Sequence, residues 1–123
     1  MAGSEIVRVA DDIKIAVVIR SDLETWQKLN VTAFLSSGMG TSAPELIGRP
    51  YEDASGLKYH PMFRVPVLVF AADARGLRRA FDRARDRGLV MAVYTDELFT
   101  TGNDVDNRAA VAAVTTDNLG LAG

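Results

Sequence analysis

Two apolar runs of this sequence end in side chains that can bind a ligand. An arginine, a serine and two aspartates come directly after the runs at 15–19 and 89–95, and two threonines lie a little further on. In open α/β sheets, ligands bind beyond the carboxyl ends of parallel strands, so we expect these side chains to share one rim of a sheet. The predicted ligand-binding residues are Arg20, Ser21, Asp22, Asp96, Thr100 and Thr101.

The same residues also have a purely structural interpretation, which the sequence leaves open. Ser21, followed three positions later by Glu24, fits a capping box at the start of a helix. Asp22 can serve the same helix start, and Asp96 and the threonines can shape a loop. The sequence identifies no catalytic residue, and Asp96 is the one candidate.

No other motif supports a cofactor or a metal. Segment 38–42 contains two glycines but follows a predicted helix and lacks the lysine of a phosphate-binding loop. His60 is the one histidine and there is no cysteine, so a zinc site would depend on carboxylates. Segment 104–107 begins like a calcium loop, yet Arg108 and Ala109 occupy places that need a ligand and a glycine. We therefore predict neither a metal nor a cofactor.

The composition is that of a soluble globular protein: 123 residues, 48% hydrophobic, with a formal net charge of −2. This charge argues against a strongly basic nucleic-acid module, although six arginines between 75 and 87 form a face that RNA phosphates could meet. No apolar run is long enough for a signal peptide or a membrane span. We expect a cytoplasmic protein with a flexible tail at 1–12 and a single α/β domain at 13–123.

The apolar pattern predicts a three-layer α/β/α fold with a mixed, mostly parallel central sheet. Continuous apolar runs are typical of strands covered on both faces, and the runs here alternate with helical patterns. Segment 65–95 is predicted to be a complete βαβ unit. The predicted strands are 13–20, 65–70 and 89–95, and the predicted helices run from the Ser21 cap to Gly38, from the Asp73 cap to Gly88, and from 104 to about 114.

Three local features complete this expectation. A hairpin is expected around the turn-rich segment 53–56, with strands at 45–48 and 57–60. On the first helix the apolar stripe is expected at residues 23, 26, 29 or 30, and 33 or 34, and on the last helix at Val105, Ala109 and Ala112. Segment 119–123 reads as the start of a strand without a partner, so a final strand is predicted to be missing.

The order of these elements resembles a known fold. Segment 14–23 followed by a helix, and segment 66–95 followed by Asp96, resemble the peptidyl-tRNA hydrolase type two fold. A closer resemblance, covering nearly everything from Ile13 to Gly123, is to an uncharacterised family, the domain of unknown function numbered two thousand. The segments that carry this second resemblance are 26–35, 44–48, 53–56 and 97–103.

The resemblance implies the fold more strongly than the activity. The hydrolase carries a lysine, a glutamine and a histidine on its first helix, where this sequence has Leu29, Ala33 and Ser36. The main hypothesis is therefore an uncharacterised protein that binds a small ligand or a partner at the strand ends. The alternative is a hydrolase acting on peptidyl-tRNA or a related ester, with Asp96 orienting water. A homodimer is also expected, because an unfinished sheet leaves an open edge.

Overall fold

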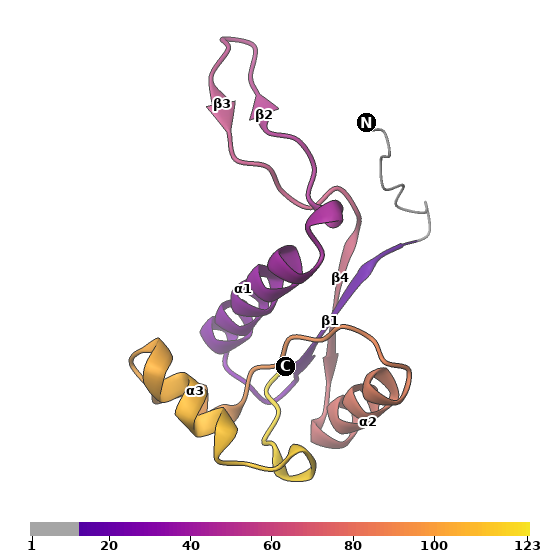
Figure 1. Cartoon of the computed structure of the whole chain (residues 1–123), viewed down its shortest axis with the longest axis vertical. Helices are drawn as coiled ribbons and strands as arrows, with labels where there is room; N and C mark the ends of the chain where they lie inside the picture. Colours follow the sequence, from indigo (N-terminus) through magenta and orange to yellow (C-terminus); the bar gives the residue numbers. More distant parts are fainter. Residues whose placement is uncertain (1–12) are drawn as a thin grey trace.

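The structure is a computed structural model, and it describes residues 13–123. The tail predicted at 1–12 lies outside the described residues. Strands and helices follow one another along the chain (Figure 1). With η for short 3-10 helices, the elements are β1 (Ile15–Arg20), α1 (Thr25–Ser42), η1 (Pro44–Leu46), β2 (Tyr51–Glu52), β3 (Lys58–Tyr59), β4 (Val67–Ala72), α2 (Ala74–Asp86), η2 (Asp96–Phe99), α3 (Asp104–Ala112) and η3 (Thr116–Asn118).

The main sheet is formed by β1 and β4, which pair in parallel. Their register runs from Ile15 opposite Val67 to Arg20 opposite Ala72. Because parallel neighbours need a long crossover, α1 and the segment after it carry the chain from the end of β1 back to the start of β4. This pairing agrees with the predicted mostly parallel sheet.

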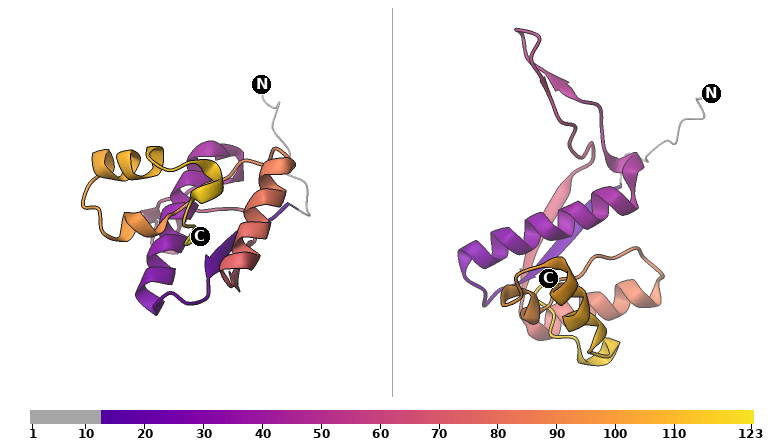
Figure 2. Two further views of the ribbon diagram at one scale, coloured as in Figure 1. Left: turned by 90° about the horizontal axis from the view of Figure 1, so that it is seen from below. Right: turned by 60° about the vertical axis from the view of Figure 1, so that its left-hand side comes forward.

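Helices α1 and α2 pack on opposite faces of β1 (Figure 2). Ile15, Val17 and Ile19 are at most 4% exposed and pack with buried residues of α1. Val18 lies on the other face, among buried residues of α2. Successive strand residues point to opposite faces, and burial of each large apolar side chain contributes about 1.5–3 kcal/mol, so both faces need a helix. The predicted α/β class with a mostly parallel sheet is confirmed.

Helix α1 begins and ends later than predicted. The capping box predicted at Ser21 is wrong: the cap is Glu24, whose backbone N–H donates to Oε1 of Gln27 at 2.9 Å. The helix also continues past Gly38 to Ser42. A Cβ at Gly38 would meet the Cβ of Ala92 at 3.0 Å. This glycine therefore permits close packing within the helix instead of ending it.

The third predicted strand, 89–95, is not formed as a strand. At its start the N–H of Leu89 donates to the carbonyl of Ala84, and at its end the backbone of residues 94–96 bonds to that of residues 120–123. A strand is defined by its ladder of hydrogen bonds, and residues 89–93 have no such ladder within the described part of the chain. The predicted βαβ unit at 65–95 is therefore incomplete.

Residues 120–123 lie between the end of β1 and residues 94–96. The carbonyl of Ala122 accepts from the N–H of Arg20 at 2.9 Å, and the N–H of Ala122 donates to the carbonyl of Tyr94 at 2.8 Å. Leu121 and Ala122 are 7% and 0% exposed. The prediction that this segment lacks a partner is wrong, because it has one on each side.

A hairpin projects away from the sheet and the helices (Figures 1 and 2). Its strands β2 and β3 pair antiparallel, and every residue from 49 to 60 is exposed. Asp53 accepts hydrogen bonds from the hydroxyl of Tyr59 and from backbone N–H groups of the turn, which lower the pKa of this carboxyl. The hairpin predicted around 53–56 is confirmed, but its first strand comes after the predicted segment 45–48.

The helix caps of α2 and α3 are made by side chains that precede each helix. Oδ1 of Asp73 accepts from an N–H of the first turn of α2 at 2.7 Å, which confirms the predicted cap.

On α3 the predicted inward face is wrong, since Val105 is 75% exposed and Ala109 and Ala112 are exposed as well. The helix turns Asn107 inward instead, where its side chain accepts a hydrogen bond from a threonine of the preceding loop.

Candidate functional site

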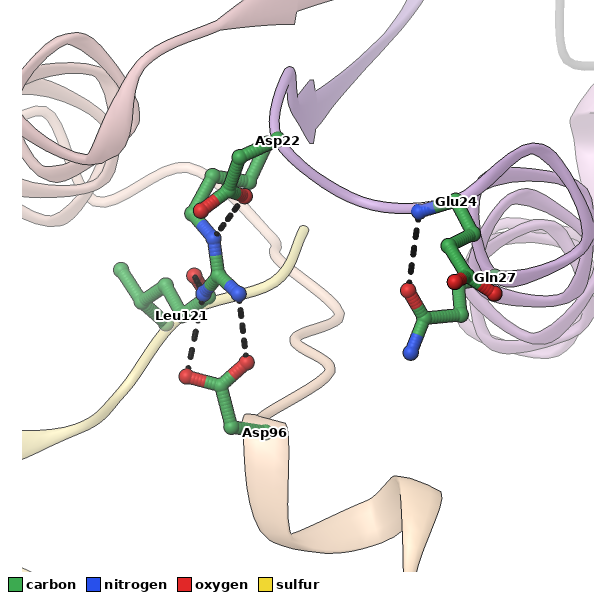
Figure 3. A network of polar contacts seen from close by, with 6 residues as sticks. Asp22, Glu24, Gln27, Asp96 and Leu121 are labelled. Atoms are coloured by element: carbon green, nitrogen blue, oxygen red, sulfur yellow. Dashed lines mark hydrogen bonds and ion pairs between the residues drawn. The ribbon is translucent and has the colours of Figure 1, made fainter.

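Arg20 joins the two strand ends that the sequence singled out. Its Nε donates to Oδ1 of Asp22 at 2.6 Å, and its Nη1 and Nη2 donate to the two oxygens of Asp96 at 3.0 and 2.8 Å. Nη1 also donates to the carbonyl of Leu121 at 2.8 Å. Figure 3 shows Asp22, Asp96 and Leu121 gathered around one guanidinium. We call Arg20, Asp22 and Asp96 the arginine cluster.

The arginine cluster does not present a free cation. The Arg20 side chain is 16% exposed, and two carboxylates face its single charge. The hydrogen bond to Asp96 is the largest cause that raises the pKa of this guanidinium above its usual value, while burial opposes the rise. Four hydrogen bonds also use most of the five donors of a guanidinium. The cluster therefore fixes η2, which begins at Asp96, against the end of β1.

The other three predicted residues lie outside the arginine cluster. Ser21 is exposed, and its backbone N–H donates to the end of β4. The hydroxyl of Thr100 donates to the carbonyl of Glu97 at 2.9 Å, within the turn that ends η2. The hydroxyl of Thr101 donates to Oδ1 of Asn107 on α3. Of these three side chains, that of Thr101 borders a pocket.

This pocket is a hollow of about 790 Å³ between α1, residues 92–94, η2 and α3. It is next to the arginine cluster, because η2 begins in the cluster and supplies part of the wall. We call it the aromatic hollow. Its aromatic lining is Trp26, Phe34, Tyr94 and Phe99, and its polar lining is Asn30, Ser37, Thr101, Asn103, Asp104 and Asn107.

The four aromatic rings form a connected group. Trp26 meets Phe99 edge to face with centroids 6.0 Å apart, and Tyr94 lies 5.0 Å from Phe99 and 5.8 Å from Phe34. The Tyr94 hydroxyl accepts from Nδ2 of Asn30 at 3.3 Å, and burial raises the pKa of this phenol. Trp26 and Phe34 are each 56% exposed. Tyr94 and Phe99 are thus packed between neighbouring rings, whereas Trp26 and Phe34 remain open to solvent.

The polar groups of the aromatic hollow are mostly uncharged. Nδ2 of Asn107 has no hydrogen-bond partner among residues 13–123, while its Oδ1 is taken by Thr101. The one carboxylate in the lining, Asp104, is paired with Nε of Arg108 at 2.8 Å. Amide groups offer a donor and an acceptor without a net charge, so the hollow suits a neutral ligand.

Sequence reasoning missed the aromatic hollow because it placed Trp26 and Phe34 on the buried side of the helix. The buried residues of α1 are Val31 and Leu35. Trp26, Asn30 and Phe34 are spaced by four and form one face of the helix. The signal available in the sequence for this hollow was an amide flanked by two aromatic residues on one face of the helix.

The arginines of α2 are only partly free. Arg78 donates to the carbonyl of Thr116 at 3.0 Å and pairs with Asp82, and Arg85 approaches Asp117 at 3.6 Å. In residues 13–123 no group of three or more His, Cys, Asp or Glu side chains is placed to hold a metal ion. None of the helices described is both long and apolar enough to cross a membrane.

Comparison with known proteins places the chain in a family. Residues 13–123 match the model of a family described as a protein of unknown function, DUF2000. The chain belongs to this family. A solved structure of a protein of unknown function from Agrobacterium tumefaciens strain C58 is similar, with a TM-score of 0.85 and 41% sequence identity over 89% of this chain and 81% of that one. No curated protein matches the chain. The family expected from the sequence is thus confirmed, and a fold family alone does not assign a function.

Proposed function

We propose that this DUF2000 protein binds a small, neutral, planar ligand in the aromatic hollow beside the carboxyl end of β1. The observation that carries the proposal is the group of four aromatic rings around a free amide donor. Ligand sites commonly have volumes of about 300–1,000 Å³, mostly apolar walls and a few polar groups that fix orientation. The aromatic hollow, with about 790 Å³, has each of these properties.

The exposure of Trp26 and Phe34 supports this proposal. A helix that packs on a sheet usually turns its large apolar side chains inward, and α1 does so with Val31 and Leu35. Two further rings on the outer side of the same helix form a patch rather than scattered exposed residues. Stacking of a planar ligand on such rings contributes about 0.5–1.5 kcal/mol per pair beyond burial of area.

The charges support a neutral ligand over an anion. The Arg20 guanidinium faces Asp22 and Asp96, so it does not attract a phosphate or a carboxylate. In this proposal Arg20 and Asp96 are positioning residues that hold η2, while Thr101 and Asn107 contact the ligand. Ser21 and Thr100 lie outside the hollow, so their predicted role in binding the ligand has no support.

Fluorescence of Trp26, the one tryptophan of the chain, tests this proposal. We would titrate the protein with adenine and nicotinamide as neutral planar probes, and with benzoate as a charged comparison. A saturable change is expected with at least one neutral probe. Asn107→Leu should weaken that binding about tenfold, which corresponds to loss of one ligand hydrogen bond. Asn118→Leu, outside the hollow on η3, is the matched control. Equal binding by both variants, or no saturation with any neutral probe, would contradict the proposal.

Peptidyl-tRNA hydrolysis, the alternative that the resemblance implies, has less support. Both oxygens of Asp96 are engaged by Arg20, so an attacking water would have to share this carboxylate with the guanidinium. At the positions of the hydrolase side chains on α1, Leu29 is 67% exposed and Ala33 is exposed. A turnover assay with peptidyl-tRNA decides the matter, since activity lost in Asp96→Asn would favour hydrolysis over simple binding.

We also propose a homodimer formed along the outer edge of β4. This strand pairs only with β1 among the described residues, so its other edge is unpaired. Leu68, Val69 and Phe70 on it are 41–55% exposed. An exposed apolar edge strand presents unpaired N–H and C=O groups on which another chain can pair. Sedimentation at micromolar concentration should show a dimer, and Val69→Lys should convert it to a monomer. A wild-type monomer would refute this assembly.

A further inference from the structure

Helix α2 carries a row of four arginines on its outer side. They are spaced by four residues, so they lie along one side of the helix. All four are exposed, whereas Leu77 and Phe81 on the inner side are buried. Figure 1 shows α2 at the end of the molecule opposite the hairpin. We call this set the arginine row, and its members are Arg75, Arg79, Arg83 and Arg87.

The arginine row makes no ion pair within the described part of the chain, because the paired arginines of α2 are two others. Arg78 pairs with Asp82 and Asp117. Arg85 pairs with Asp117 as well. Segment 75–87 has six arginines and two aspartates, a net charge of +4, so the rest of the chain carries −6. The charge of the protein is therefore uneven, and its positive side lies on α2.

Helix stability does not explain the arginine row. Positive side chains are favoured near the carboxyl end of a helix, where Arg83 and Arg87 lie, and disfavoured near its start. Arg75 lies in the first turn of α2 and Arg79 in the second, so these two gain nothing from the helix dipole. Because they also have no carboxylate partner among residues 13–123, their guanidinium groups remain available to bind an anion.

The residue type and the spacing favour phosphates arranged in a regular line. Segment 75–87 contains no lysine, and arginine can donate two parallel hydrogen bonds to one phosphate. A helix rises about 1.5 Å per residue, so the arginine row is about 18 Å long with one charge about every 6 Å. One strand of duplex DNA presents about five phosphates over this length, since they are about 3.4 Å apart along its axis.

The other side chains of α2 favour a DNA duplex over other polyanions. Proteins bind single strands by stacking bases on aromatic rings, and the one aromatic residue of α2, Phe81, is buried. They bind duplex RNA through its 2′-hydroxyl groups, and α2 has no hydroxyl or amide side chain to contact these. A helix at a membrane surface inserts its apolar side, but that side of α2 is packed against β1 and Leu121.

We propose that the arginine row binds the phosphate backbone of double-stranded DNA without reading its sequence. Each arginine neutralises a phosphate and releases condensed counterions, so the affinity falls as salt is added. Side chains that contact phosphates carry no information about the bases, so no sequence preference is expected. This inference does not depend on the ligand of the aromatic hollow, because no residue of α2 lines that hollow.

Fluorescence anisotropy with a short fluorescein-labelled DNA duplex tests the proposal. Four phosphate contacts predict a slope of about −3.6 for the logarithm of the association constant against the logarithm of the salt concentration. Raising the salt from about 50 to 200 mM should therefore weaken binding about 150-fold. Replacing two arginines together, Arg75→Gln and Arg79→Gln, should reduce the slope to about −1.8. Arg49→Gln, which removes an exposed arginine of the hairpin, is the matched control and should keep the wild-type slope.

Further arms identify the partner. Circular dichroism should show the same helix content in the double variant as in the wild type, so that a changed slope does not come from unfolding. An unchanged slope in the double variant, or no saturable binding at about 50 mM salt, would overturn the proposal. Tighter binding of a single strand or of an RNA duplex of the same sequence would contradict the assignment to double-stranded DNA. Cosedimentation of the wild type, but not of the double variant, with phosphatidylserine vesicles would identify a membrane as the partner instead.

Discussion

Replacing Arg20 with methionine should destabilise the protein by about 2–3 kcal/mol. Methionine keeps an apolar chain of similar length but removes the donors to Asp22, Asp96 and the carbonyl of Leu121. Leu121 is 7% exposed, and a buried carbonyl without a partner costs about 1–3 kcal/mol. The carboxylates contribute less, because their side chains are 72% and 48% exposed and water replaces the guanidinium.

A double-mutant cycle with Asp96→Asn separates these contributions. The Arg20–Asp96 pair is bidentate, yet half of the Asp96 side chain is exposed, so we expect a coupling of about 1 kcal/mol. The remaining loss in Arg20→Met then comes mainly from the buried carbonyl of Leu121, with a smaller share from the exposed Asp22. The free energy of unfolding of all four proteins is measured by urea unfolding followed by circular dichroism. Salt at 1 M should reduce the coupling energy of the Arg20–Asp96 pair but not the contribution of the Leu121 carbonyl.

Arg108→Met is the matched control for this cycle. Nε of Arg108 donates to Asp104 at 2.8 Å, as in a good ion pair, but both side chains are more than 70% exposed. It should cost less than about 0.5 kcal/mol. Arg20 is expected to stabilise the fold because it donates to the buried carbonyl of Leu121. This is refuted if Arg20→Met destabilises the protein no more than Arg108→Met.

Three further predictions concern packing and pH. Gly38→Ala should destabilise the protein by about 1 kcal/mol despite the better helix propensity of alanine, because the added Cβ meets the Cβ of Ala92 at 3.0 Å. Gly102→Ala is the control and should leave stability unchanged, because the space around Gly102 is open. Thr95→Val should raise the free energy of unfolding by about 1 kcal/mol, since the Thr95 hydroxyl is buried without a partner in the described part of the chain; a loss of stability would contradict this. Burial raises the pKa of Tyr94, so its contribution to stability is complete below the unfolded pKa of about 10 and is lost as pH rises through the folded value. Urea unfolding between pH 9 and 11 should therefore show a decline that is smaller in Tyr94→Phe and unchanged in Tyr51→Phe.

The sequence predicted those parts of the fold that depend on local pattern. The apolar runs of β1 and β4, the Asp73 cap and the hairpin turn at 53–56 each follow from neighbouring residues. The meeting of Arg20 with Asp96 followed from a general rule about strand ends. These features need no knowledge of which distant segment packs against them.

The rest depended on tertiary contacts that a single sequence does not reveal. Segment 89–95 has the composition of a strand, but a strand also needs a bonded neighbour. Gly38 looks like a helix stop until Ala92 is found beside it. The aromatic hollow lies between elements far apart in the chain, so the exposure of Trp26 became visible only with α3 and η2 in place.

The projecting hairpin divides the protein into two structural halves. Before its turn lie β1 and α1, and after it lie β4, α2 and α3 (Figure 1). Each half carries one strand of the main sheet and at least one covering helix, yet neither can bury its apolar surface alone. A backbone cut at the tip would therefore leave two fragments that recognise each other, and this DUF2000 protein could serve as a split reporter whose signal depends on reassembly.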